Sequence, residues 1–152
     1  MNRKNFLSLF TAGITLPSVT HATDLPDPAG IIPPFLKSGD TIGITSPAGY
    51  ITEQELQPAV NKMQEWGFKV RIGKTIGKRD FSFGGTDPER ANDFQQMLDD
   101  ASIKAIMCAR GGYGMVRIID KLDFSKFIVK PKWIIGFSDV TVIHSHINSI
   151  YK

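Results

Sequence analysis

Residues 133–141 read Trp133-Ile134-Ile135-Gly136-Phe137-Ser138-Asp139-Val140-Thr141. The first three residues are apolar and favour a β-strand, whereas the segment from Val140 to Ile150 is compatible with a helix. A strand, a tight turn with a central serine and a helix are the parts of a nucleophile elbow, which exposes a serine hydroxyl above the edge of a sheet. Backbone N–H groups beside such a turn can stabilise an oxyanion. The stretch therefore predicts a nucleophilic serine at position 138.

The same stretch leaves a second interpretation open. The usual elbow sequence is Gly-x-Ser-x-Gly, and Val140 stands where the second glycine is expected. A serine directly before a helix can also be an N-cap, whose hydroxyl accepts a hydrogen bond from the first helical turn. On these residues alone, Ser138 fits both a nucleophile and a helix cap.

Apolar runs alternate with amphipathic segments along the chain. We predict strands at residues 41–45, 68–72, 103–109 and from 133, and helices from Thr52, from Thr86, over 115–122 and from Val140. The first two helices each begin with a capping box, in which a threonine is followed three residues later by a glutamate. Their buried faces are predicted to hold Leu56, Val60, Met63 and Trp66, and Ala91, Phe94, Met97, Leu98 and Ala101. The alternation indicates an α/β fold, a Rossmann-like parallel sheet with helices on both faces.

Three loops with site-forming residues follow strands of this predicted sheet. Ser46 follows the first strand, Gly111-Gly112 the third and Ser138 the fourth. Because ligands collect outside the carboxyl ends of parallel strands, we expect these loops to meet at one edge. Glycines allow backbone amides to approach a ligand closely, although the same glycines also fit a plain tight turn. The chain has neither Gly-x-Gly-x-x-Gly nor a Walker lysine, which argues against a nucleotide site.

A serine nucleophile needs a general base, and the sequence offers few candidates. His144 and His146 follow Ser138 on the predicted helix, which carries them away from the hydroxyl at about 1.5 Å per residue. We therefore expect both to be ordinary helix residues. Cys108, the single cysteine, lies in an apolar run and is expected to be a buried core residue. No Cys–His cluster or His-Glu-x-x-His spacing predicts a metal site.

The charge distribution gives no support for a nucleic-acid partner. The net charge is +3, and removing Arg3 and Lys4, the only charged residues in positions 1–22, lowers it by two to +1. Nucleic-acid-binding domains usually present a clustered basic face. We expect the ligand to be a small molecule or a peptide.

The first 37 residues are predicted to be a signal peptide and a linker, and 38–152 the folded domain. Residues 1–22 combine a short basic region, an apolar run and a small-residue cleavage site at Ala22. They resemble a Sec or a degenerate twin-arginine signal, which predicts export to the periplasm, with a cytoplasmic N-terminal helix as the alternative. The apolar run is too short to span a membrane. Residues 23–37 contain four prolines and are expected to be an extended linker or an arm laid on the domain.

Three longer motifs occur in a fixed order along the chain. They are Gly85-Thr86-Asp87-Pro88-Glu89-Arg90-Ala91, then Ile106-Met107-Cys108-Ala109-Arg110-Gly111-Gly112-Tyr113-Gly114, and then Pro131-Lys132 followed by residues 133–141. Together they resemble the N-terminal domain of the LD-carboxypeptidase family of serine peptidases. This family includes murein tetrapeptide carboxypeptidases and microcin C self-immunity proteins. The resemblance runs from about Phe35 to the end of the chain, and Ser46-Pro47-Ala48 is similar to the family's first loop.

The resemblance implies a Ser-His-Glu hydrolase that removes a terminal D-amino acid from an L-residue in peptidoglycan peptides, without a cofactor. Ser138 corresponds to the family's nucleophile. The backbone N–H groups of Gly112 and Asp139 correspond to its oxyanion hole. A homodimer is also implied by the resemblance.

Family members carry the glutamate and the histidine in a second, C-terminal domain, and the active site lies between the two domains. This sequence stops at Lys152, in the helix after the nucleophile, so we expect the C-terminal domain to be missing and the isolated chain to be nearly inactive. That expectation agrees with the lack of a base within reach. The alternative is a non-catalytic remnant that binds muropeptide-like ligands or pairs with a separate C-terminal domain.

Overall fold

The computed structural model describes residues 32–151. The predicted signal peptide (1–22) and most of the predicted linker (23–37) lie outside the described residues, and both stay predictions.

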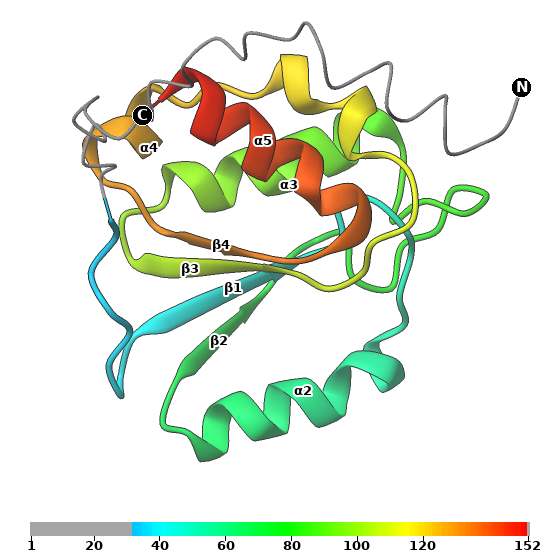
Figure 1. Ribbon diagram of the computed structural model, residues 1–152. Coiled ribbons are helices and arrows are strands. Elements are labelled where there is room, and N and C mark those ends of the chain that lie inside the picture. The colour runs from blue at the N-terminus through cyan, green and yellow to red at the C-terminus, as the bar shows by residue number, and fades with distance from the viewer. Residues whose placement is uncertain (1–31, 152) are drawn as a thin grey trace, which may run out of the picture.

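A four-stranded parallel sheet forms the centre of the molecule (Figure 1). Its strands are β1 (Thr41–Thr45), β2 (Lys69–Ile72), β3 (Ile103–Cys108) and β4 (Trp133–Ile135). They lie in the order β2-β1-β3-β4, and each neighbouring pair is parallel. The chain adds β2 on one side of β1 and then β3 and β4 on the other. The direction of winding therefore reverses between β1 and β3, the place where open α/β sheets usually bind ligands.

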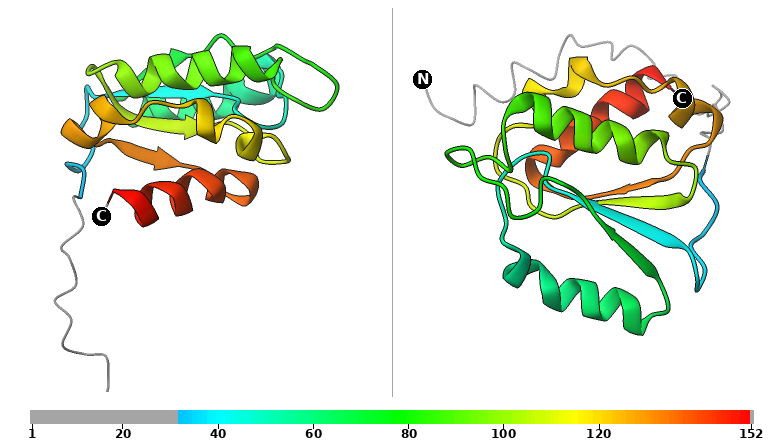
Figure 2. Two further views of the ribbon diagram at one scale, coloured as in Figure 1. Left: turned by 90° about the horizontal axis from the view of Figure 1, so that it is seen from above. Right: turned by 180° about the vertical axis from the view of Figure 1, so that it is seen from behind.

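Helices cover both faces of the sheet (Figures 1 and 2). One face carries α2 (Glu53–Glu65), and the other carries α3 (Asp87–Asp99) and α5 (Thr141–Ile150), with the short α4 (Ser125–Val129) beside α3. The described residues also form three single 3₁₀ turns, η1 (Met115–Arg117), η2 (Ile119–Lys121) and η3 (Ser138–Val140). The predicted Rossmann-like parallel sheet with helices on both faces is confirmed.

The two faces of the sheet bury separate apolar clusters. On the α3 and α5 side, Phe94, Ile106 and Ile143 are all fully buried. On the α2 side, Ile44 and Leu56 belong to the second cluster, which also includes Ala105 of β3. Apolar side chains of β3 thus point to both faces, as the apolar character of that strand predicted.

Both predicted capping boxes are present. The Thr52 hydroxyl accepts a hydrogen bond from the Glu55 amide at 3.2 Å, and the Glu55 carboxylate accepts one from the Thr52 amide at 2.9 Å. Thr86 and Glu89 form the same pair at the start of α3. Glu89 also accepts a hydrogen bond from the Lys78 ammonium at 2.6 Å, and this bond, together with those from Thr86, lowers the pKa of Glu89 to about 2. The sequence therefore specifies where α2 and α3 begin.

Four details differ from the sequence-based expectation. Residues 115–122 form two 3₁₀ turns instead of one α-helix, because Ile118 between the turns has a φ of −117°, which is too extended for a continuous α-helix. Trp66 is 64% exposed because α2 ends at Glu65, one residue before it. Ala101 is exposed in the turn after α3. The short helix α4 was not predicted.

The described part of the predicted linker lies against β4. The Trp133 indole Nε1 donates a hydrogen bond to the Pro34 carbonyl at 2.9 Å, and the rings of Phe35 and Trp133 stack with their centroids 6.4 Å apart. Since β4 is the last strand in the sheet order, this contact joins the segment before β1 to an edge of the sheet. These residues are an arm laid on the domain.

We expect Phe94→Ala to lower the free energy of unfolding by about 3–5 kcal/mol, because the truncation leaves a cavity at a fully buried position. Urea denaturation monitored by circular dichroism measures the change. Phe81→Ala is the matched control, since the Phe81 side chain is 86% exposed and its loss is expected to change the free energy by about 0.5 kcal/mol at most. Equal losses in the two variants would contradict this core.

Candidate active site

The loops that follow β1, β3 and β4 meet at one edge of the sheet, as predicted. The Gly49 amide donates a hydrogen bond to the Gly111 carbonyl at 2.9 Å, which joins the β1 loop to the β3 loop. Gly111 in turn lies against Ser138 in the β4 loop, where a Cβ on the glycine would come within 2.9 Å of the serine Cβ. Only a glycine allows this approach without displacing the serine. Ser46 is fully buried and donates its hydroxyl hydrogen bond to the Gly49 carbonyl, so it shapes the β1 loop.

The backbone of Ser138 has the conformation of a nucleophile elbow. Its φ is 60°, in the left-handed region that residues other than glycine seldom adopt, and the residue is exposed. Strain of this kind is stored at functional sites, and the strand-to-helix turn of hydrolases is one example. Phe137 is the cap residue of η3, and the Ser138 side chain makes no capping hydrogen bond. The helix-cap interpretation of Ser138 is therefore wrong.

Gly136 explains how this elbow accommodates valine at position 140. A Cβ on Gly136 would lie only 2.6 Å from Val140 Cγ1, so the two positions face each other across the turn. Both residues are small in the usual Gly-x-Ser-x-Gly sequence. Here the glycine before the serine makes room for a fully buried valine after it.

Two backbone N–H groups flank the serine. Gly112 has a φ of 112° and follows Gly111, the residue in contact with Ser138, while Asp139 follows Ser138 directly. Among the backbone groups of residues 32–151, neither amide has a carbonyl partner outside the regular elements. Free N–H groups on both sides of an exposed hydroxyl suit the stabilisation of a negatively charged oxygen. Their assignment as an oxyanion hole stays a prediction.

Arg90 is a residue of the candidate site that the sequence motifs did not predict. This residue is fully buried, and its guanidinium donates hydrogen bonds to the carbonyls of Gly85, Pro47 and Gly114, of which the last two lie in the β1 and β3 loops. The position of Arg90 in the sequence could have indicated that it is buried. Arg90 precedes Phe94 by four residues and so lies on the buried stripe of α3, where an arginine needs partners.

The two histidines of α5 are engaged away from the serine. His144 Nε2 lies 3.1 Å from the Ile134 carbonyl oxygen, and the His146 ring packs against Phe124 with centroids 5.3 Å apart. Within residues 32–151, no histidine, lysine or carboxylate side chain forms a hydrogen bond with the Ser138 hydroxyl. The prediction that His144 and His146 are ordinary helix residues agrees with these contacts.

Cys108 is buried at the end of β3, as predicted. Burial raises the pKa of its thiol to about 12, because a thiolate would lose its hydration there. The thiol is therefore protonated at neutral pH and is a poor nucleophile.

The described chain shows neither a metal centre nor a membrane-spanning helix. No group of three or more histidine, cysteine, aspartate or glutamate side chains within residues 32–151 is arranged to hold a metal ion. In the same part of the chain, none of the helices has the length and apolar character needed to cross a bilayer.

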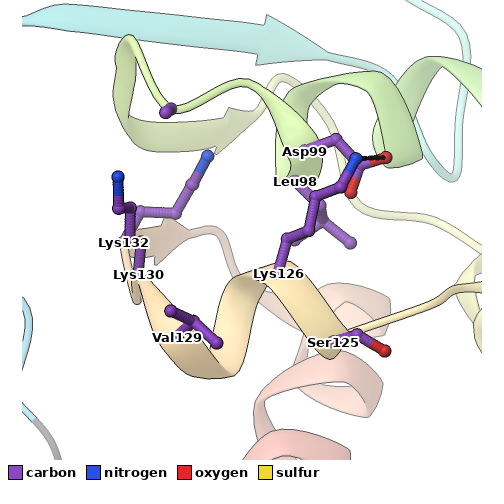
Figure 3. Close-up of a pocket in the computed structure, with 8 residues that line it drawn as sticks. Leu98, Asp99, Ser125, Lys126, Val129, Lys130 and Lys132 are labelled. Carbon is purple, nitrogen blue, oxygen red and sulfur yellow. Dashed lines mark ion pairs between the residues drawn. The ribbon is translucent and has the colours of Figure 1, made fainter.

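A pocket of about 360 Å³ lies between the end of α3 and α4 (Figure 3). Its residues precede β3 and β4, so it belongs to the amino-terminal edge of the sheet, opposite Ser138. Lys126 and Asp99 form an ion pair there with a separation of 3.3 Å. Lys132 donates hydrogen bonds to the carbonyls of Met97 at 2.9 Å and Asp100 at 2.7 Å. The Lys132 ammonium therefore caps the carboxyl end of α3.

Comparison with known proteins shows to which family the chain belongs. Residues 42–151 match the family model described as the LD-carboxypeptidase N-terminal domain. The chain belongs to the LD-carboxypeptidase family. The family resemblance predicted from the sequence is confirmed.

Curated relatives of the chain carry related names. The probable murein peptide carboxypeptidase of Bacillus subtilis is 36% identical over 116 residues, which cover 76% of this chain and 36% of that protein. The microcin C7 self-immunity protein MccF of Escherichia coli is 38% identical over 111 residues, which cover 71% of this chain and 32% of that protein. The chain thus spans about a third of the length of these two LD-carboxypeptidase relatives.

Solved structures of the LD-carboxypeptidase family share the fold. MccF in complex with aspartyl sulfamoyl adenosine matches 80% of this chain and 37% of its own, with 34% identity and a TM-score of 0.75. The muramoyltetrapeptide carboxypeptidase of Oxalobacter formigenes matches 68% of this chain and 34% of its own, with 29% identity and a TM-score of 0.61. One MccF structure is described as an active-site mutant in which a serine, an asparagine and a lysine are replaced by alanine.

We expect Gly136→Ala to destabilise the protein by about 1–3 kcal/mol, because the new methyl group would overlap the Val140 side chain. Adding Val140→Ala to Gly136→Ala removes the overlap, so the loss in the double variant should be smaller than the sum of the two single losses. Urea denaturation of all four proteins gives the coupling energy. Additive losses would show that the two positions are not in contact.

We expect the Cys108 thiol to resist iodoacetamide at pH 8 in the folded protein, since a thiol with a pKa of about 12 is almost wholly protonated at that pH. Mass spectrometry measures the labelling, and the same protein in urea provides the control. Because the chain has one cysteine, every label reports on Cys108. Rapid labelling of the folded chain would contradict its burial.

Proposed function

We propose that this chain provides the nucleophile and the oxyanion hole of a serine LD-carboxypeptidase that acts on peptidoglycan peptides. The observation that carries the proposal is the strained, exposed Ser138 in contact with the glycine loop after β3. The names of the relatives support the substrate class, since one is a probable murein peptide carboxypeptidase and another a muramoyltetrapeptide carboxypeptidase. The MccF active-site mutant supports serine chemistry, because a serine is among the residues replaced in it.

In the proposed reaction, Ser138 Oγ attacks the carbonyl carbon of the bond to a terminal D-amino acid and passes its proton to a general base. The carbonyl oxygen becomes an oxyanion, which accepts hydrogen bonds from the N–H groups of Gly112 and Asp139. The C–N bond then breaks, and the leaving amine takes the proton from the base. Water hydrolyses the acyl-serine and restores the Ser138 hydroxyl.

The base comes from outside residues 32–151 in this proposal, because His144 and His146 are engaged elsewhere. The family resemblance assigns a histidine and a glutamate to a second domain, and the chain spans about a third of its relatives. The activity is therefore proposed for a protein in which both domains are present.

A second function is favoured because no base lies beside Ser138 within residues 32–151. Without a proton acceptor for Ser138, the chain would bind a muropeptide-like ligand and leave it intact. Binding and hydrolysis make different predictions for a serine variant, so one experiment separates them.

The test uses the longest polypeptide encoded in frame with this chain. Its substrate is a peptidoglycan tetrapeptide that ends in D-alanine, and the same peptide ending in L-alanine serves as the substrate control. We expect Ser138→Ala to lower kcat by a factor of about 10⁴ or more, because the nucleophile is lost, while the peptide still binds. Alanine release measures hydrolysis, and calorimetry on the peptide measures binding.

Ser145→Ala is the matched control, since this serine is exposed on α5 and outside the elbow. It should keep the activity of the unmodified protein. Hydrolysis that survives Ser138→Ala would rule out the proposed nucleophile. Binding of the peptide without hydrolysis by the unmodified protein would support the second function, and the absence of both would contradict the peptide substrate.

A further inference from the structure

One peptide unit at the candidate site is held from both sides. The Gly114 carbonyl accepts a hydrogen bond from Arg90 Nη1 at 2.9 Å. The Met115 amide, which belongs to the same peptide unit, donates a hydrogen bond to Asp139 Oδ2 at 2.6 Å. A guanidinium thus holds one end of the unit and a carboxylate the other. Hydrogen bonds to charged partners are stronger than neutral ones, and these two act from opposite directions.

The Arg90 guanidinium is fixed in position by the hydrogen bonds that it donates. Besides Gly114, it donates hydrogen bonds to the Gly85 carbonyl at 3.1 Å, to the Pro47 carbonyl and to the Asp87 carboxylate. Asp87 supplies the opposite charge that a fully buried cation requires. Through Pro47 and Gly114, one side chain connects the β1 loop to the β3 loop.

The Asp139 carboxylate connects the β4 loop to the same peptide unit. Asp139 follows Ser138, so any shift of the elbow would move the carboxylate relative to the Met115 amide. The loop between β3 and η1 needs such restraint, because three of its residues are glycines (Gly111, Gly112 and Gly114), which have access to more backbone conformations than other residues. A flip of one peptide in that loop would reorient the neighbouring amides, including that of Gly112.

We propose that Arg90 and Asp139 are positioning residues, which clamp the Gly114–Met115 peptide and thereby hold the glycine loop in place beside Ser138. The catalytic part of this inference rests on the proposed function. The clamp itself is a property of the folded chain, and it can be measured without any activity.

The first arm of the test measures hydrogen exchange of the Met115 amide by NMR. Asp139→Ala removes the acceptor, so the exchange rate of this amide should rise by about tenfold or more, while the amides of β1 keep their rates. Asp139→Asn retains a carbonyl oxygen as acceptor and should restore most of the protection. Asp120→Ala is the matched control, because Asp120 is exposed in the neighbouring turn η2.

The second arm measures steady-state kinetics on the in-frame polypeptide and the tetrapeptide. We expect Asp139→Ala and Arg90→Lys to lower kcat by about 10- to 100-fold and to change KM by less than about twofold, since a displaced loop affects the transition state more than substrate binding. Arg90→Lys keeps the charge but loses the planar fork that reaches several carbonyls. Arg71→Lys, at an exposed arginine of β2, is the control. If Arg90→Lys does not fold, the two Asp139 variants decide the result.

The two arms distinguish this inference from the proposed function. If the Met115 amide exchanges at the same rate in Asp139→Ala as in the unmodified protein, no clamp exists, whatever the activity. If the exchange rate rises but Asp139→Ala keeps its kcat in a protein that needs Ser138, the positioning role is overturned. If the exchange rate rises and the protein hydrolyses nothing even when unmodified, the clamp stands and the proposed function fails.

Discussion

Parallel pairing brings the ends of β1, β3 and β4 level with one another, and the geometry of the candidate site depends on this register. Thr45 lies opposite Cys108, and Met107 lies opposite Ile135, so the three loops begin within one or two residues of the same line. The β3 strand lies between the other two. Its loop can therefore contact both of the others, and one residue of it, Gly111, reaches both, since it bonds to Gly49 and touches Ser138.

Glycines and charged residues have different roles in holding these loops together. Gly111 and Gly136 have no side chain, so Gly111 can lie against Ser138 and Gly136 can lie against Val140. The absence of a Cβ in glycine permits these contacts, but it also gives the loops more conformational freedom. Arg90 and Asp139 restrict that freedom with charged hydrogen bonds, so the site combines small residues at its contacts with charged residues around them.

Much of this arrangement could be predicted from the sequence because it depends on local patterns. The capping boxes at Thr52 and Thr86 and the apolar strands specify α2, α3 and the sheet without reference to distant residues. Ser138 and the glycines were also found, because turns and elbows have characteristic residues. Arg90 was missed because three of its four acceptors are carbonyls, which every residue has and no sequence pattern marks. The 3₁₀ turns after Gly114 were missed because the buried residues Met115, Ile118 and Ile119 have the spacing of an α-helix.

The arm that precedes β1 affects the order in which the domain can assemble. The contact between Pro34 and Trp133 joins residues 99 positions apart, and it involves the strand that leads into the elbow. Contacts of such high sequence separation form late, and a chain that emerges from the ribosome folds its first segments before its last ones exist. The sheet of β1, β2 and β3 can therefore begin to form while β4 is still being synthesised. Because Ser138 follows β4, a chain made only as far as β3 contains three strands of the sheet but not the turn in which Ser138 has its positive φ.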